Sequence, residues 1–304
     1  MEIHKIETSV LKAWAIIFVV ISHIVNIYFK GDLSFTGLLG TGGVAVFLFL
    51  SGYGLYVSYE DKGLSKNFWN NKIQNIFLPY WLVTCIYYLI FIQEKSAVVL
   101  MKNLFCIDYE RKIDGTMWYM SFLIIWYLLF YFLYSFEIHN IVRIFILFLF
   151  AYCLREKADL FKACGWQFSN NFLSFPIGVS FAFISKRLRL NALTWTASIL
   201  LTLTALIYVC LINKASYQQT GILIIMILVL VVYIKRKLNF QCRIFMIIGN
   251  CSYLIYLIEG KIFDILPKTT YPSFNTIIYL ICLSTLTFII IYIKRVKIPL
   301  ILKK

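Results

Sequence analysis

Charged residues are scarce in this chain. Only 14% of its 304 residues are Asp, Glu, Lys or Arg, whereas 61% are hydrophobic. A soluble domain of this length carries charge on about a quarter of its residues, so the composition excludes an ordinary soluble protein. Its apolar runs are instead long enough to cross a bilayer as helices. The sequence therefore predicts an all-α integral membrane protein embedded in the lipid bilayer.

The chain also lacks the residue patterns of metal sites. No two of its eight cysteines form a CxxC pair, and His4, His23 and His139 lack the spacing of metal ligands. Most of the cysteines lie in or beside apolar stretches, where cysteine behaves as a small hydrophobic residue. A metal site is therefore not expected. Cys106 and Cys164 are expected on the same side of the membrane and are able to form a disulfide, although free thiols are favoured.

No internal repeat, low-complexity tract or long linker interrupts the sequence. This uniformity predicts a single membrane domain over residues 1–304, without an appended soluble domain. A cleavable signal peptide is also missing, because the first apolar run is too long for an h-region and no small-x-small cleavage site follows it. That first run is expected to stay in place as the first spanning helix.

Apolar runs separated by turn and charge signals predict about ten membrane-spanning helices. The fifth, sixth and eighth runs are short for a full crossing, so their boundaries are the least certain. The ten runs cover residues 9–29, 40–59, 73–92, 117–136, 141–154, 172–185, 193–212, 219–234, 244–266 and 274–293.

The distribution of charge predicts how these helices are oriented. With the amino terminus in the cytosol, the cytosolic segments hold most of the 29 Lys and Arg residues, and the outer segments hold most of the 14 Asp and Glu residues. Cytosolic loops of membrane proteins carry such an excess of basic residues. We therefore expect a multi-pass protein of the plasma membrane with both termini in the cytoplasm. The net charge of +15 then needs no nucleic-acid partner.

Lys12 and His23 interrupt the first apolar run. They are eleven residues apart, which on an α-helix amounts to about 1100° of rotation, or three turns with about 20° left over, and to about 16 Å along the axis. Both side chains therefore point to one face of the helix. A histidine deep in the membrane is a functional-site hypothesis by default. The alternative is a structural histidine bonded to a neighbouring helix, with Lys12 as an anchor at the interface.

Three other runs contain polar residues or helix breakers. The second run includes SGYG at residues 51–54, for which close helix packing is favoured and a broken or kinked helix is the alternative. Pro176 and Gly178 predict a kink in the sixth run. The third run begins beside Lys72 and Asn75, which form either an interfacial anchor or a polar mouth for an anionic ligand.

Further polar and aromatic residues are expected near the outer interface. The segment Gln93 to Thr116 has mixed charges and is interpreted as a solvated loop, with contacts to a sugar as the alternative. Trp118 and Tyr119 fit an aromatic belt, although sugars also stack on such rings. Glu259 lies near the outer end of the ninth run, so we expect its carboxylate to reach the interface.

Five motifs follow one another along the chain. Lys12 with His23 fits a basic-x10-His signature, and GGVAVFLFLSGYGL resembles an FF-x-LSGF pattern. The segments KIQNIFLPYWLV, MWYMSFLIIWYLL and IGNCSYLIYLIEG resemble R-x-x-R-I-x-P-x-Y-W, WYL and G-x-x-SY-x-IYL-x-H, respectively. In this order they resemble acyltransferase family 3, multi-spanning bacterial membrane proteins that O-acylate surface polysaccharides, peptidoglycan or Nod-type oligosaccharides. The resemblance runs from the first to the ninth predicted span.

The resemblance implies an enzyme with an intramembrane catalytic cavity. It would move an acyl group, most simply acetyl from acetyl-CoA, to a hydroxyl of a cell-surface polysaccharide or lipid-linked oligosaccharide. Acyl-CoA is then a co-substrate, and no bound cofactor is implied. His23 is the implied catalytic residue, either as general base or as the acylated group. The expected substrate-binding residues are Lys12, Ser51, Tyr53, Lys72, Asn75, Tyr80, Trp118, Tyr119, Ser252, Tyr253 and Glu259.

The sequence departs from the family pattern at two places. Lys72 and Asn75 stand where the family has two arginines, which weakens the implied phosphate contacts, and KRLR at residues 186–189 is a candidate substitute. Glu259 stands in place of the terminal histidine of the last motif, so the role of that histidine is not transferred. A transporter or flippase of lipid-linked sugars is the alternative function, because broken helices and a buried histidine suit it too.

Overall fold

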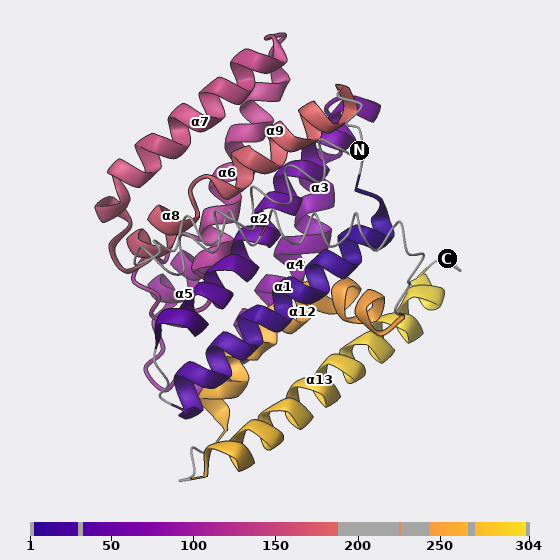
Figure 1. Ribbon diagram of the computed structural model, residues 1–304. Coiled ribbons are helices and arrows are strands. Elements are labelled where there is room, and N and C mark those ends of the chain that lie inside the picture. The colour runs from indigo at the N-terminus through magenta and orange to yellow at the C-terminus, as the bar shows by residue number, and fades with distance from the viewer. Residues whose placement is uncertain (1–2, 30–32, 188–224, 226–242, 267–270, 302–304) are drawn as a thin grey trace.

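A computed structural model describes residues 3–29, 33–187, 225, 243–266 and 271–301. All secondary structure in these ranges is helical, as expected (Figure 1). Within the described residues, six helical segments are long and apolar enough to cross a membrane. They are Lys5–Phe29, Gly37–Lys62, Phe68–Phe91, Trp118–Ser135, Arg243–Ile265 and Pro272–Tyr292.

The expected number of ten spans stays a prediction. The fifth and sixth expected spans are the helices α7 (Asn140–Glu156) and α9 (Ser174–Arg187), of 17 and 14 residues. At 1.5 Å per residue both are shorter than a hydrocarbon core of about 30 Å. The seventh and eighth, at residues 193–212 and 219–234, lie outside the described residues.

The remaining elements follow in chain order. Several helices continue directly into one another, which is why a single membrane span is divided among two or three labels. The elements are α1 (Lys5–Ile24), η1 (Val25–Phe29), α2 (Leu33–Lys62), α3 (Phe68–Lys72), η2 (Ile73–Phe77), α4 (Leu78–Phe91), α5 (Ala97–Leu104), α6 (Trp118–Ser135), η3 (Ala158–Cys164), α8 (Gly165–Asn171), α12 (Arg243–Ile265) and α13 (Pro272–Ile301).

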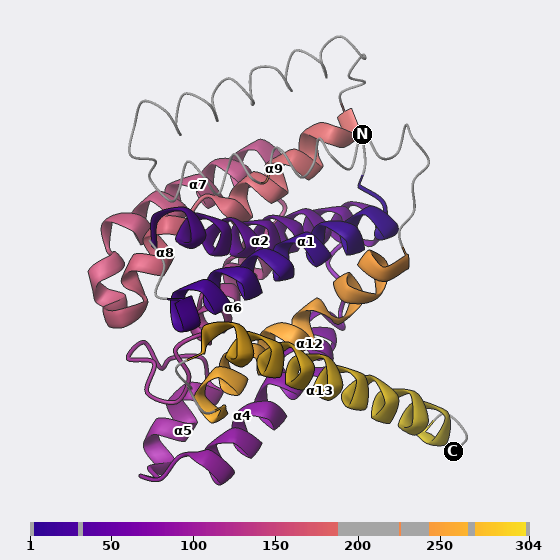
Figure 2. The same cartoon turned by 60° about the horizontal axis from the view of Figure 1, so that its bottom comes forward.

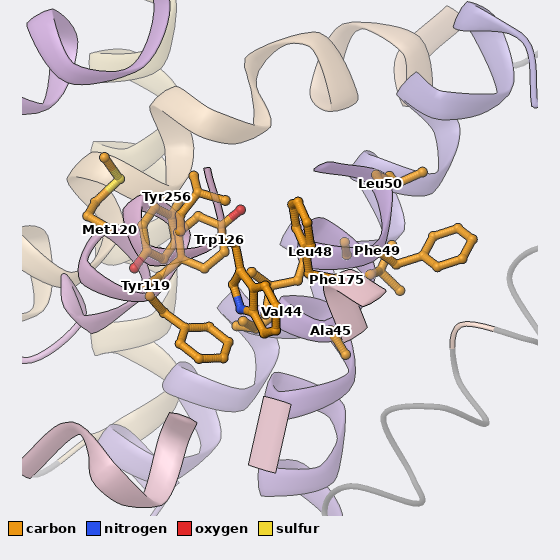
Figure 3. Close-up of a cluster of buried hydrophobic side chains, with 14 of the residues drawn as sticks. Val44, Ala45, Leu48, Phe49, Leu50, Tyr119, Met120, Trp126, Phe175 and Tyr256 are labelled. Carbon is orange, nitrogen blue, oxygen red and sulfur yellow. The ribbon is translucent and has the colours of Figure 1, made fainter. Parts of the chain in front are cut away.

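Helix α1 is central to the bundle, with α2 packed along one side and α12 along another (Figures 1 and 2). The apolar core lies where α2, α6 and α9 meet (Figure 3). There the fully buried Trp126 of α6 stacks on Phe175 of α9, with ring centroids 5.2 Å apart. The first residues of α1 and the last of α13 lie at the same end of the bundle, as both termini in one compartment would require (Figure 1).

Small residues allow α2 and α9 to approach closely. A Cβ atom on Gly52 would lie 2.4 Å from the Phe175 carbonyl oxygen, and one on Gly178 would lie 2.1 Å from the Phe49 carbonyl oxygen. This confirms the packing interpretation of the second run. The alternative of a broken helix is wrong, because α2 runs without interruption from Leu33 to Lys62.

Two prolines lie at the beginnings of helices. Pro176 is the third residue of α9, within the first turn, where a missing N–H breaks no intrahelical bond. The prediction of a kink at this point is therefore wrong, since Pro176 lies in the first turn of α9. Pro79 is the second residue of α4 and directly follows η2, which is one turn of π-helix. Because proline has no N–H, the Asn75 carbonyl four residues earlier receives no bond from it.

The segment from Gln93 to Thr116 is only in part the solvated loop that we expected. It contains α5 and folds back along α4, where the Tyr80 hydroxyl donates to the Asn103 carbonyl at 2.7 Å. Trp81 Nε1 likewise donates to the Leu104 carbonyl at 2.8 Å. Its acidic residues Asp108 and Asp114 are buried. Two of its charges therefore lie inside the protein, whereas Glu94, Lys95, Lys102, Glu110 and Lys112 are exposed.

Gly178→Ala should destabilise the protein. The added methyl group meets a backbone carbonyl of α2, which cannot move as a side chain can, and overpacking of this kind costs about 1–3 kcal/mol. Gly54→Ala is the matched control, because a Cβ there meets nothing within 4 Å and alanine favours a helix over glycine by about 1 kcal/mol. Thermal unfolding in detergent should show a lower midpoint for the first variant alone. Equal midpoints would contradict the close α2–α9 contact.

Candidate functional site

Six of the expected site residues line one cavity of about 240 Å³, which we call the inner cavity. They come from five elements that are far apart in sequence, so only the fold brings them together. The cavity lies beside the half of α1 that begins the chain. The six residues are Lys12, Ser51, Asn75, Tyr119, Ser252 and Tyr253.

The inner cavity carries positive charge. Lys12 lines it directly. Lys72 lies next to the lining residue Tyr127, with its Nζ 4.6 Å from the centroid of that ring. Lys72 therefore adds a second positive charge beside the wall of the inner cavity. No carboxylate lines this cavity in the described part of the chain. An anionic group is therefore the ligand that its electrostatics favour.

A second cavity of about 220 Å³, the outer cavity, contains His23. Val44 and Tyr256 line both cavities, so the two adjoin at these side chains. The expected site residue Trp118 also lines the outer cavity. Most of the remaining lining residues are small or polar: Ser22, Asn26, Gly37, Gly40, Thr41, Arg111, Gly115, Thr116, Gln167 and Asn171.

His23 is paired with Glu259. Its Nδ1 lies 2.9 Å from Glu259 Oε2, and the Glu259 side chain is completely buried, whereas 32% of the His23 side chain is exposed. Our expectation that Glu259 reaches the interface is therefore wrong. The Tyr279 hydroxyl of α13 donates to the same oxygen at 3.4 Å, while Oε1 has no hydrogen-bond partner among the described residues.

The pair determines which nitrogen of the imidazole a substrate meets. A carboxylate only accepts hydrogen bonds, so the proton of the pair lies on Nδ1. Nε2 is then the nitrogen left to a ligand in the outer cavity, with a lone pair able to accept a proton. The arrangement is that of a general base oriented by a buried carboxylate.

A buried ion pair lies two residues beyond Glu259 along α12. Lys261 Nζ pairs with Asp114 Oδ2 and also donates to the Leu257 carbonyl at 3.0 Å. The other oxygen of Asp114 accepts from the Thr116 N–H at 2.7 Å and from the Thr116 hydroxyl at 2.6 Å. These bonds fasten the folded-back segment 93–117 to α12, two residues after Glu259.

Four expected site residues line neither cavity: Tyr53, Lys72, Tyr80 and Glu259. Lys72 and Glu259 contact the lining residues Tyr127 and His23, whereas Tyr53 and Tyr80 have other partners. The Tyr53 hydroxyl accepts from the Ile3 N–H at 2.7 Å, and its ring packs against Phe181 of α9. Tyr80 is buried and bonds to Asn103, which joins α4 to the folded-back segment. The placement of Tyr53 and Tyr80 favours packing roles in place of substrate binding.

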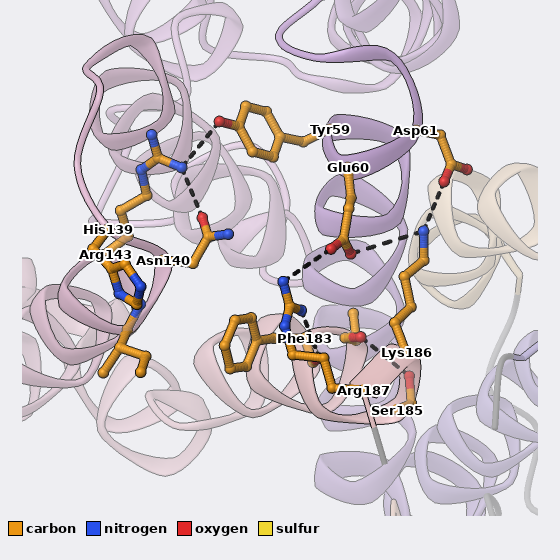
Figure 4. Close-up of polar contacts among 12 residues, drawn as sticks. Tyr59, Glu60, Asp61, His139, Asn140, Arg143, Phe183, Ser185, Lys186 and Arg187 are labelled. Atoms are coloured by element: carbon orange, nitrogen blue, oxygen red, sulfur yellow. Dashed lines mark hydrogen bonds and ion pairs between the residues drawn. The ribbon is translucent and has the colours of Figure 1, made fainter. Parts of the chain in front are cut away.

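The first two residues of the basic KRLR segment, Lys186 and Arg187, form ion pairs with acidic residues at the end of α2 (Figure 4). Lys186 Nζ lies 2.6 Å from Asp61 Oδ1, and Arg187 Nη2 lies 3.2 Å from Glu60 Oε1. These two cations therefore fasten α9 to α2 and do not line the inner cavity. Arg189 lies outside the described residues.

Cys106 and Cys164 are free thiols in the structure, as favoured from the sequence. Burial raises the pKa of Cys106 to about 12 and that of Cys164 to about 11. Both thiols therefore stay protonated at neutral pH. In the described part of the chain, no three His, Cys, Asp or Glu side chains gather into a group able to hold a metal ion.

The site residues expected from the sequence did not include Arg111, Asn171 and Tyr256, which line the outer cavity, or Tyr279, which bonds to Glu259. Arg111 belongs to a segment interpreted as solvated, and Asn171 and Tyr279 belong to no motif. Tyr256 follows Tyr253 by three residues and belongs to the IYL part of the last motif, so the helical period of α12 and that motif are the signals that could have placed it at the site.

A family model for an acyltransferase domain matches residues 6–296. The chain belongs to acyltransferase family 3. No curated protein and no solved structure shows a significant match. Membership of family 3 confirms the resemblance of the five motifs, and together with the apolar helices it makes the protein a multi-pass membrane acyltransferase.

In this family 3 protein, the Asp114–Lys261 pair should contribute to stability. Lys261→Met leaves a buried carboxylate without its cation, which typically costs about 3–5 kcal/mol, so the unfolding midpoint in detergent should fall sharply. Replacing both residues, with Asp114→Asn and Lys261→Met, should recover part of the loss. Lys112→Met, which breaks an exposed pair with Glu110, should change little. An intact midpoint in Lys261→Met would contradict the pairing.

Proposed function

We propose that the protein transfers an acyl group, most simply acetyl, from cytosolic acyl-CoA to a hydroxyl of a cell-surface or lipid-linked polysaccharide. The observation that carries the proposal is the meeting of two unlike cavities at Val44 and Tyr256. One cavity is cationic and contains Lys12, and the other is polar and contains the His23–Glu259 dyad. A donor and an acceptor can thus approach the same point from two sides.

The inner cavity suits the thioester donor. Lys12 and Lys72 would attract the phosphates of the nucleotide, and a plasma-membrane orientation with cytoplasmic termini would open this cavity to the cytosol. The cavity is small beside a whole CoA molecule, so the nucleotide would stay at the mouth. The thin pantetheine arm would extend past Tyr127 and Tyr119 towards Tyr256.

His23 would carry out the proton transfer. Nε2 takes the proton of the acceptor hydroxyl as its oxygen attacks the thioester carbon. The carbon–sulfur bond then breaks, and the CoA thiolate receives the proton, which yields an ester and a free thiol. The same nitrogen also serves if it is acylated first and then passes the group to the hydroxyl. Glu259 would stabilise the imidazolium formed in either route.

His23→Ala should abolish measurable transfer, since a general base contributes about 10²- to 10⁴-fold to rate. The measurement is transfer of labelled acetate from acetyl-CoA to polysaccharide in membranes that contain the protein. His139→Ala is the control, because His139 caps α7 away from both cavities. Full activity in His23→Ala would overturn the mechanism. Sugar translocation without any acetyl transfer by the unaltered protein would favour a transporter or flippase.

Lys12→Ala should weaken binding of the acyl donor more than binding of the acceptor. Loss of a charge-assisted contact with a phosphate should raise the KM for acyl-CoA about tenfold or more, with a smaller change in the KM for the acceptor. Lys66→Ala, at an exposed position between α2 and α3, provides the matched loss of charge. Equal effects of the two substitutions on the KM for acyl-CoA would contradict donor binding at the inner cavity.

A further inference from the structure

The outer cavity contains a group of recognition side chains that the proton-transfer mechanism does not use. They are contributed by the folded-back segment, by the start of α6 and by α8, none of which carries the dyad. The group consists of Arg111, Trp118, Trp166, Gln167 and Asn171.

Arg111 gives this cavity a permanent positive charge. Among the described residues it forms no ion pair. The acids near it in sequence have other partners. Glu110 pairs with Lys112 and Lys162, and Asp114 pairs with Lys261. Asp108 accepts from Asn103 Nδ2 and from the Lys112 N–H. No carboxylate lines the outer cavity in the described part of the chain. The charge of Arg111 is therefore available to a ligand.

Neutral groups beside Arg111 fix its position without cancelling its charge. One orientation of the Gln167 amide satisfies both of its ends. In that orientation, its nitrogen donates to the Ala163 and Cys164 carbonyls at 3.0 and 3.3 Å, and its oxygen accepts from Arg111 Nη1 at 2.7 Å. The backbone of Arg111 has φ +55°, in the left-handed region that residues other than glycine rarely adopt. Residues held in such conformations cluster at ligand-binding and catalytic sites.

The same cavity has groups that suit hydroxyls and sugar rings. Asn171 is 2% exposed and donates through Nδ2 to the Gln167 carbonyl at 2.9 Å, while its Oδ1 has no partner among the described residues. Such an acceptor gains from a hydroxyl donor. Trp118 and Trp166 add large apolar ring faces, and Trp166 is 54% exposed.

We propose that the outer cavity binds an acidic sugar, whose carboxylate or phosphate pairs with Arg111 while a hydroxyl of the same ligand reaches His23. Guanidinium groups bind carboxylates and phosphates through two parallel hydrogen bonds. Such a pair of bonds would fix the orientation of the sugar ring. The inference rests on the proposed function, because it names the class of acceptor for that site. It restricts the acceptor to anionic glycans.

Binding to the purified full-length protein tests the inference without relying on catalysis. The probes are an oligosaccharide that contains a hexuronic acid and its counterpart with the carboxylate reduced to an alcohol, titrated calorimetrically in detergent. The acidic ligand should bind about 10- to 100-fold more tightly, as expected for one charge-assisted contact. Inorganic phosphate is the third probe and should compete only weakly.

Three variants separate charge from folding. Arg111→Gly removes the charge, and glycine adopts φ +55° without strain, so the variant should fold and lose the preference for the acidic ligand. Arg111→Lys should retain part of the preference. Lys112→Gln removes a neighbouring charge that does not line the cavity and should leave the preference unchanged.

The inference is overturned if the unaltered protein binds neither sugar, binds both equally, or keeps its preference in Arg111→Gly. It is also overturned if phosphate alone displaces both sugars equally well. A transfer assay on the same preparations distinguishes the two proposals. Tight, Arg111-dependent binding without any acyl transfer would refute the proposed function and leave the acidic-sugar site standing.

Discussion

The carboxylate of Glu259 is completely buried in the helical bundle, where an uncompensated charge is strongly unfavourable. Two groups from other helices meet it, the imidazole of His23 on α1 and the hydroxyl of Tyr279 on α13. Much of the geometry of the site follows from the need of this buried carboxylate for hydrogen-bond donors. Because Glu259 engages Nδ1, the imidazole has a fixed orientation, and Nε2 is left for chemistry.

The helices α1, α2 and α12 then set the distance between donor and acceptor. Each carries one residue or group at the level of the inner cavity and another at the outer cavity: Lys12 and His23 on α1, Ser252 and Glu259 on α12. On α2, Ser51 and Thr41 hold the equivalent places. Val44 and Tyr256 lie between the two levels. Close packing at Gly52 and Gly178 keeps α2 against α9, so these levels stay in register.

The sequence alone predicted what depends on helical periodicity. The spacing of Lys12 and His23 indicated a shared face, and the two residues do line adjoining cavities. The same rule, applied to α2, would have excluded Tyr53, because residues two apart on a helix point about 200° away from each other and Ser51 faces the inner cavity. The motif drew attention to both residues, but only one can face the site.

Contacts between distant segments could not be predicted in this way. Glu259 was expected at the interface because it is near the end of a span, yet the folded-back segment 93–117 fastens to α12 beside it through Asp114 and Thr116. Mixed charges in that segment are typical of a solvated loop, and only the pairing of Asp114 with Lys261 in space reveals that Asp114 is buried. Arg111 and Asn171 went unnoticed for the same reason.

The position of the proton on His23 tests the central claim most directly. Nitrogen-15 NMR of protein labelled at its three histidine imidazoles, with His23 assigned by the loss of its signals in His23→Gln, reports which ring nitrogen is protonated in the neutral form. The account predicts a protonated Nδ1 and a bare Nε2, and a shift towards protonated Nε2 in Glu259→Gln. A protonated Nε2 in the unaltered protein, or identical spectra in the two proteins, would contradict it.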